Sequence, residues 1–384
     1  MVAAVRRSLS PRKAAKRLGV SLRTVQIWVG RAEGQRLDRF DWSDRPRGGR
    51  REACAIPARV EDLVVRLRKQ LWEKSALGDC GARAIREELQ RRETKPLPSV
   101  RTIGRILLRK VLLDGRRRVR RPPPPPGWYL PRVAAGKAEL ESFDFVEGLV
   151  IRGGIDVMVF NGMSIHGGLA SSWVESAWTA KKTVETLVVH WREQGLPAYA
   201  QFDNDTIFQG PHQYPDTFGR VTRLCLQLGV TPVFTPPRET GFRAAIESDN
   251  GRWQAKVWRR FEHDSLRTLR RHSDRNVDAA RKRSAARRDA APRRQTFPTD
   301  WKLDLQKPLR GKVIFLRRTN DLGVASLLGQ TYTVDHAWPN RLIRAEVDLT
   351  RGEINFYRLR RRDPKQQPLI RTIPYATPKK RFHE

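Results

Sequence analysis

Three acidic residues, Asp144, Asp203 and Glu247, combine a side-chain type and local surroundings that suit metal chemistry. Hard divalent ions such as Mg²⁺ prefer carboxylate oxygens, so a few Asp and Glu side chains from different elements can hold them. Two ions at one site can activate a nucleophile, shield a leaving oxygen and neutralise charge during phosphodiester cleavage. The three carboxylates therefore predict a two-ion phosphoryl-transfer site that uses Mg²⁺, with Mn²⁺ as a possible substitute.

The first carboxylate lies in a segment whose pattern is typical of a strand. Phe143 and Phe145 flank Asp144, and successive side chains of a strand point to opposite faces. We therefore expect Asp144 to face away from both aromatic rings. Asp156, in the next predicted strand, is the alternative for this ligand.

The other two carboxylates also have competing interpretations. Asp203 ends a short predicted strand, where it can simply cap a turn, and Asp205 is a close competitor. Glu247 lies near the start of a predicted helix and can be an ordinary surface residue. Asp249 follows two positions later and faces away from Glu247 by helical geometry. The order of the three elements, rather than any single residue, favours a shared site.

The elements that would position these carboxylates lie between residues 138 and 275. Predicted strands at 143–151, 155–163 and 167–174 form a meander, because only short Gly-containing connections separate them. Helix, strand, helix, strand and helix then follow at about 180–191, 199–202, 221–228, 231–235 and 246–261. This order predicts an α/β RNase H-like core.

The composition points to a polyanionic partner. The chain carries 76 Lys and Arg against 41 Asp and Glu among 384 residues, a formal net charge of +35. Neutralising phosphates releases their counterions, so double-stranded DNA is the expected partner. A membrane surface is not expected, because the basic residues are spread along the whole length. The spacing of the cysteines does not suit a zinc site, and with no apolar membrane-spanning run we expect a cytoplasmic protein.

Residues 1–50 carry a helix-turn-helix pattern. Gly19 marks the turn and Ser21 is the expected N-cap of the second helix. That helix would expose side chains of the kinds that contact base edges and phosphates in the major groove, namely Arg23, Thr24, Gln26 and Arg31. A DNA-binding module is predicted, and a helical hairpin that serves only for packing is the alternative.

Residues 57–114 predict a second helix-turn-helix or winged-helix module. Arg101, Arg105 and Arg109 recur every four residues along one stripe of its last helix. They can contact DNA or form an ordinary solvated face. An arginine-rich stretch and five prolines follow, so we interpret 115–137 as a basic, proline-rich linker.

The C-terminal part predicts a change of architecture. Residues 276–305 are polar, basic and interrupted by Pro292, which indicates a second basic linker, with a frayed helix as the alternative. Strand-like segments at 312–317, 330–334, 343–349 and 353–357 predict a small all-β SH3-like barrel over 306–362. Residues 363–384 are predicted to be a basic tail.

Three segments, 141–145, 194–208 and 229–258, resemble the integrase core of bacterial DDE transposases with a retroviral-integrase-like catalytic domain. The order of modules and barrel fits the same group, so the resemblance covers nearly the whole chain. By this resemblance Asp144, Asp203 and Glu247 match the DDE triad. Asn250 and Gln254 stand where relatives place DNA-contacting residues.

Two features depart from the family pattern. Arg243 and Ala244 replace the Asn-Gly pair that commonly precedes the family's glutamate. The interval between Asp203 and Glu247 is also wider than the family's usual spacing.

The resemblance implies a DNA transposase of the bacterial nucleoid. The N-terminal modules would recognise the ends of a mobile element, the carboxylates would hold two Mg²⁺ ions, and a freed 3′ hydroxyl would attack target DNA. Joining two ends implies a homo-oligomer, a dimer or higher, on DNA. The alternatives are a domesticated, non-catalytic DNA-binding regulator and an RNase H-type nuclease.

Overall fold

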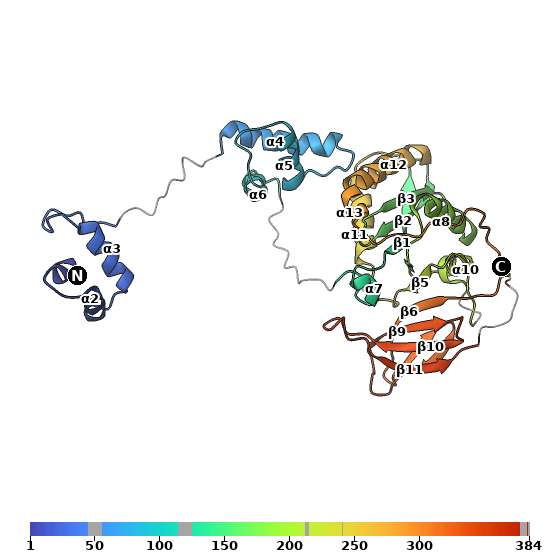
Figure 1. Cartoon of the computed structure of the whole chain (residues 1–384). Helices are drawn as coiled ribbons and strands as arrows, with labels where there is room; N and C mark the ends of the chain where they lie inside the picture. The colour runs from blue at the N-terminus through green and yellow to red at the C-terminus, as the bar shows by residue number, and fades with distance from the viewer. Residues whose placement is uncertain (45–55, 114–124, 212–214, 240, 377–381, 383–384) are drawn as a thin grey trace. The chain divides into compact units, whose positions relative to one another are not determined.

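The computed structural model describes residues 1–44, 56–113, 125–211, 215–239, 241–376 and 382 (Figure 1). Its internal contacts divide the chain into two compact units, Met1–Asp62 and Leu63–Glu384.

The described part of the first unit contains three complete short helices, α1 (Val2–Arg6), α2 (Pro11–Leu18) and α3 (Leu22–Ala32). Ser10 and Ser21 cap α2 and α3, because each hydroxyl accepts a hydrogen bond from a backbone N–H group of the first turn. Gly19 ends α2 in the left-handed conformation, with a φ of 65°, which glycine adopts at little cost. The turn and the N-cap predicted at these positions are confirmed.

A second group of helices consists of α4 (Ala58–Lys74), α5 (Ala82–Arg91) and α6 (Val100–Arg109). Ser99 caps α6 in the same way. The apolar sides of α5 and α6 are buried through Ile85, Leu89, Ile103, Ile106 and Leu107. The three amphipathic helices predicted in this region are therefore present.

Among the described residues, nine strands form one mixed sheet in the order β11-β10-β9-β6-β5-β4-β1-β2-β3. The strands up to β5 are β1 (Leu140–Ile151), β2 (Ile155–Ser164), β3 (Ala170–Glu175), β4 (Tyr199–Phe202) and β5 (Thr231–Phe234). The later ones are β6 (Lys312–Arg318), β9 (Leu342–Asp348), β10 (Glu353–Arg358) and β11 (Leu369–Pro374). β1, β4, β5 and β6 pair in parallel, and the other neighbours pair antiparallel. β7 (Val324–Leu327) and β8 (Gln330–Thr333) form a separate hairpin.

The helices described before and between these strands are α7 (Pro131–Ala134), α8 (Ala180–Gln194), α9 (Thr206–Gln209), α10 (Arg220–Gln227), α11 (Ala244–Trp253), α12 (Leu266–Arg283) and α13 (Ala285–Asp289). A π-helical turn, η1 (Gln254–Trp258), extends α11. The order of strands and helices predicted for the core is observed, with the short helix α9 as an addition between β4 and α10. The last helix differs from the prediction, because its α-helical part ends at Trp253 and η1 ends before Phe261.

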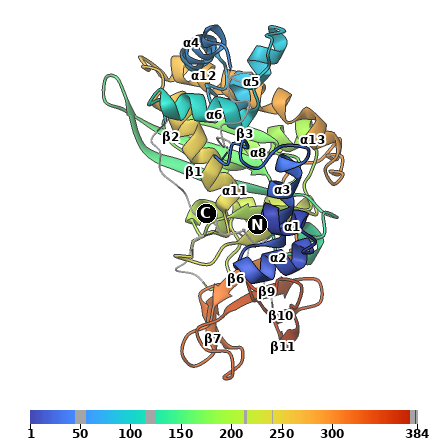
Figure 2. The same ribbon diagram turned by 90° about the vertical axis from the view of Figure 1, so that its left-hand side faces the viewer.

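An aromatic core fills one face of the sheet. Phe143 stacks between Phe160 and Phe202, with ring centroids 5.4 and 5.5 Å away, and α8, α9 and α10 pack there. Phe145 packs against the same core. Asp144 therefore points to the opposite face, as predicted, where α11 lies across β1 and β2 (Figure 2).

The predicted linker at 115–137 is too long, because its second part is packed. Trp128, Tyr129, Leu130 and Val133 are buried and join a cluster with residues of β1, β5 and β6. Burial of three large apolar side chains and Tyr129 holds this segment against the sheet. Residues 114–124 lie outside the described residues.

The second predicted linker, 276–305, is also packed against the core. α12 continues to Arg283 and α13 follows it, so the helical alternative is nearer to the observed structure. Arg294 pairs with the fully buried Glu141 of β1 at 2.5 Å. His190 and Trp191 of α8 also contact this carboxylate, at 2.8 and 3.2 Å. The polar and basic composition of this segment indicated a linker. It could not reveal the packing, because the partners of Arg294 are distant in the sequence.

The C-terminal strands were predicted at nearly the correct positions, but as a separate barrel. In the structure β6 pairs with β5, so these strands extend the core sheet. The reason lies in β6, whose residues 313–317 are all buried, as is typical of a strand covered on both faces. The predicted tail at 363–384 also contains β11, which pairs with β10.

Candidate active site

The parallel pairing of β1 and β4 brings two of the predicted carboxylates together. The ladder joins Ser142 to Gln201, so Asp144 within β1 and Asp203 after β4 both lie just beyond the paired segment. Their side chains are 15% and 34% exposed, so both are reachable from solvent.

A single guanidinium bridges the two carboxylates. Arg243, the N-cap residue of α11, forms an ion pair with Asp144 and a second one, at 3.3 Å, with Asp203. Its Nε is buried and has no hydrogen-bond partner among the described residues. Arg243 therefore places a positive charge between the two predicted metal ligands.

The electrostatic environment of Asp144 is mixed. Burial raises the pKa of its carboxyl group above the ordinary value, the Arg243 charge opposes this rise, and the Asp203 charge adds to it. The net direction is upward. A cation close to Asp144 therefore lowers the cost of keeping its carboxylate ionised.

Two asparagines orient Asp144. Asn250 of α11 donates from Nδ2 to Asp144 Oδ2 at 2.8 Å. Asn161 of β2 donates from its own Nδ2 to Asn250 Oδ1 at 2.9 Å, and it stands directly opposite Asp144 in the β1–β2 ladder. This relay fixes one oxygen of Asp144 and leaves the other for Arg243. Asn250 was predicted to contact DNA, but it is only 9% exposed and its amide is engaged within the protein.

The turn that carries Asp203 is held from the C-terminal strands. Asp203 Oδ1 accepts the backbone N–H of Asp205 at 3.0 Å. Arg317 of β6 donates to Asn204 Oδ1 at 2.8 Å and to Thr235 O at 3.2 Å. Arg317 is buried and nothing in the sequence pattern indicated its role, because it belongs to the region predicted as a separate barrel.

The structure separates the predicted ligands from two of their rivals. Asp156 is exposed and pairs with Val150 near the β1–β2 turn, away from Asp144. Asp205 caps α9, because its Oδ1 accepts the N–H of Ile207 at 2.7 Å. Asp144 and Asp203 are the carboxylates that share Arg243.

Glu247 does not join this pair. It lies in the first turn of α11 and is exposed. Among the described residues, no group of three or more His, Cys, Asp or Glu side chains is arranged to hold a metal ion. Asp249 on the same helix is buried and forms an ion pair with Arg252. Burial raises the pKa of Asp249.

The donor set nevertheless suits a hard divalent cation in one respect. Two carboxylates already converge on one positive group, and carboxylate oxygens are the ligands that Mg²⁺ prefers. Asp144 and Asp203 could hold such an ion only if the guanidinium of Arg243 moved away from them. Glu247 would have to approach them in addition.

The predicted DNA-contacting residues of α3 differ in their surroundings. Arg23 and Gln26 are exposed. Thr24 takes part in the N-cap of α3, with its hydroxyl 2.7 Å from that of Ser21. Arg31 lies over the Trp28 ring and donates to Ser43 O at 3.1 Å. Two of the four side chains thus have structural contacts.

On α6, Arg101, Arg105 and Arg109 are all exposed, as the stripe predicted. Gln254 is partly buried at the start of η1. A DNA contact of these residues remains a prediction.

Sequence reasoning did not identify Asn161 as part of the site. One signal was available, because Asn161 interrupts the otherwise apolar stretch of β2 next to the strand of Asp144. A buried polar side chain in such a strand requires a partner. That partner is Asn250.

No protein-family model and no curated protein matches this chain. Among solved structures, the chain is similar to the catalytic core domain of BIV integrase, with 15% identity over 36% of this chain and 80% of that one and a TM-score of 0.27. It is also similar to a chain of the simian T-cell lymphotropic virus intasome in complex with PP2A regulatory subunit B56 gamma. In that case the identity is 10% over 72% of this chain and 88% of that one, with a TM-score of 0.32.

No helix in the described part of the chain is both long and apolar enough to span a bilayer.

Proposed function

We propose that this protein is a DNA transposase or integrase that cuts the 3′ ends of a mobile element and joins them to target DNA. The observation that carries the proposal is the convergence of Asp144 and Asp203, from neighbouring parallel strands, on one positive charge. α11, which packs over β1 and its neighbour β2, also carries Glu247. The net charge of +35 suits a DNA substrate.

Asp144 and Asp203 would hold Mg²⁺, and Glu247 would complete the site. Bound ions would supply an activated water and neutralise charge at the phosphodiester. Asn250 keeps one Asp144 oxygen in place, and Arg317 holds the turn of Asp203. Arg243 links the site to the start of α11, because its carbonyl accepts the N–H of Glu247 at 2.9 Å. Displacement of Arg243 would therefore act on the helical turn that carries the third carboxylate.

The test is a cleavage and joining assay with the full chain. The substrate is a labelled duplex copied from the genomic DNA that flanks the gene, with Mg²⁺, Mn²⁺ or EDTA added. We expect nicking at a 3′ end and joined products with either ion and none with EDTA. Absence of both products with both ions, or equal nicking in EDTA, would contradict the proposal. Cleavage of the RNA strand of a hybrid alone would indicate a nuclease of the RNase H type.

A non-catalytic DNA-binding regulator is the second candidate. Arg243 favours it, because its single guanidinium pairs with both carboxylates without any metal ion. Tight DNA binding with no cleavage under any ionic condition would support this alternative.

Replacing Arg243 tests whether its side chain competes with a metal ion for the two carboxylates. We expect Arg243→Ala to bind Mn²⁺ on the order of tenfold more tightly than the wild type. The reason is that the substitution removes the guanidinium, a cation that competes with Mn²⁺ for the two carboxylates. Titration of free Mn²⁺ by electron paramagnetic resonance measures this affinity without any need for activity. Arg238→Ala is the control, since Arg238 is an exposed arginine of the same connection and should leave the affinity unchanged. Equal Mn²⁺ affinity in all three proteins would show that Arg243 does not compete with the ion.

A further inference from the structure

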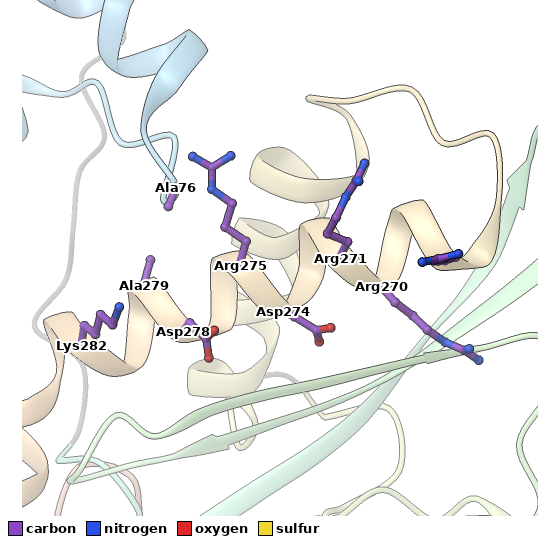
Figure 3. A pocket seen from close by; sticks show the side chains of 9 residues that line it. Ala76, Arg270, Arg271, Asp274, Arg275, Asp278, Ala279 and Lys282 are labelled. Atoms are coloured by element: carbon purple, nitrogen blue, oxygen red, sulfur yellow. The ribbon is translucent and has the colours of Figure 1, made fainter.

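α12 presents a cationic face that the candidate active site does not use. Five basic residues of the helix and Ala76, from the loop after α4, line a hollow of about 930 Å³ (Figure 3). The basic residues are Arg267, Arg270, Arg271, Arg275 and Lys282. Together they define what we call the α12 cationic face.

The spacing along the helix places these residues on one side. Arg267, Arg271 and Arg275 follow one another at four-residue intervals, and residues four apart are neighbours on a helix surface. Lys282 lies two turns beyond Arg275 on the same side. The opposite side of α12 is buried through Leu269, Ser273, Asn276, Val277 and Ala280. The face is therefore held rigidly.

Some of these side chains have structural contacts and others have none. Arg270 donates to Val174 O at 2.9 Å and pairs with Glu175 at 2.6 Å. Arg275 donates to Lys74 O at 3.4 Å. Arg267, Arg271 and Lys282 are exposed and have no hydrogen bond or ion pair with any described residue. These three charges are available to a ligand.

The loop after α4 forms a second wall of the hollow. Asn276 Nδ2 donates to Ala76 O at 3.3 Å, and Arg283 forms an ion pair with Asp79. Lys256 of η1 donates to Gly78 O at 2.8 Å. The predicted second DNA-binding module and α12 thus meet at this surface.

The distribution of charge along α12 suits two phosphate strands rather than one anion. Arg267 and Arg271 lie at one end of the face and Lys282 at the other, with Asp274 and Asp278 between them. The distance from residue 271 to residue 282 along the helix is about 16 Å. A major groove is about 12 Å wide and presents base edges, some of them donors, between its phosphate strands. Carboxylates between two cationic ends would face those edges and not the phosphates.

We infer that the α12 cationic face binds double-stranded DNA across a groove, with Arg267 and Arg271 on one phosphate strand and Lys282 on the other. This inference rests on the proposed function, because that function names DNA as the substrate. It adds a DNA contact on the core, apart from the residues predicted on α3 and α6.

The test compares two triple variants of the full chain that lose equal charge. One is Arg267→Gln, Arg271→Gln, Lys282→Gln. The control is Lys302→Gln, Lys307→Gln, Arg310→Gln, in exposed residues of the segment before β6. Binding to a generic duplex is measured by fluorescence anisotropy between about 50 and 200 mM salt, the range over which phosphate contacts dominate the salt dependence. Thermal unfolding verifies that both variants are folded.

We expect the α12 variant to bind at least about tenfold more weakly at the lower salt concentration. Its plot of log affinity against log salt should be shallower by about 2 to 3, since each lost phosphate contact removes about 0.9. The control should keep the wild-type slope. Equal losses of DNA affinity in both variants would mean that only the net charge of the protein matters. No loss of DNA affinity in the α12 variant would assign this face to another partner, such as an acidic protein. Either result would overturn the inference.

The outcomes also separate this inference from the proposed function. Normal metal-dependent cleavage with unchanged DNA affinity in the α12 variant would contradict DNA binding by the α12 cationic face and leave the proposed function standing. Loss of DNA affinity in that variant, with no cleavage by the wild type, would contradict the proposed enzymatic function and support DNA binding by the α12 cationic face.

Discussion

Asp203→Asn is expected to lose metal-dependent cleavage and joining by roughly 10³-fold or more. Charge stabilisation by bound ions contributes several kcal/mol to such a reaction, and each 1.36 kcal/mol corresponds to a factor of ten in rate. The amide keeps the shape of the side chain but supplies no negative charge. DNA affinity should be equal or higher, because an acidic residue near the DNA is removed. Product formation and duplex binding are measured on the same protein preparations.

Asp156→Asn is the matched control for this prediction. Asp156 was the rival ligand, and it is exposed near the β1–β2 turn. Its replacement should leave cleavage within about twofold of the wild type, as surface substitutions usually have small effects. Unchanged activity of Asp203→Asn would reject our assignment of the site.

Arg294→Ala is expected to lower the free energy of unfolding by about 3 to 5 kcal/mol, the cost of leaving a buried charge without its partner. Glu141 is fully buried, and its remaining partners would be His190 and Trp191. Urea unfolding of the full chain measures the change. Arg293→Ala is the control, because Arg293 is exposed, and it should change the stability by less than about 0.5 kcal/mol. Equal stability of both variants would show that Arg294 does not hold the segment after α13.

The same pair predicts a dependence on pH. Burial alone would raise the pKa of Glu141, but Arg294 and His190 lower it to about 2, against an ordinary value of 4.5. A depressed pKa stabilises the folded state above the unfolded value, and this contribution is lost as pH falls from about 4.5 to about 2. In Arg294→Ala, Glu141 can take up a proton at higher pH. The stability difference between wild type and variant should therefore shrink below about pH 4.5.

Local patterns predicted much of the core. The aromatic residues on either side of Asp144 placed it on the correct face, because alternation in a strand depends only on neighbours in sequence. The short strand before Asp203 and the helix that Gly195 ends were predicted for the same reason. From these elements the sequence placed Asp144 within one strand and Asp203 at the end of its neighbour.

Contacts between distant segments were not predictable in this way. The side chain of Arg243 bridges Asp144 and Asp203 through folding of the whole core, and its sequence neighbours give no sign of it. The basic segment around Arg294 has the composition of a linker, and tertiary contacts override that tendency. Glu247 was placed on the correct type of element, but a helix assignment does not state how close a side chain comes to its partners.

The pairing of β6 with β5 makes the C-terminal fifth of the chain a structural support of the chemistry. Phe234 and Phe315 stand side by side in that ladder and stack at 5.2 Å, while Arg317 reaches the turn beside Asp203. A protein shortened before residue 306 would expose the unpaired edge of β5, and such edges invite association with other chains. Evolution or engineering could therefore exchange this region only together with the core that it completes.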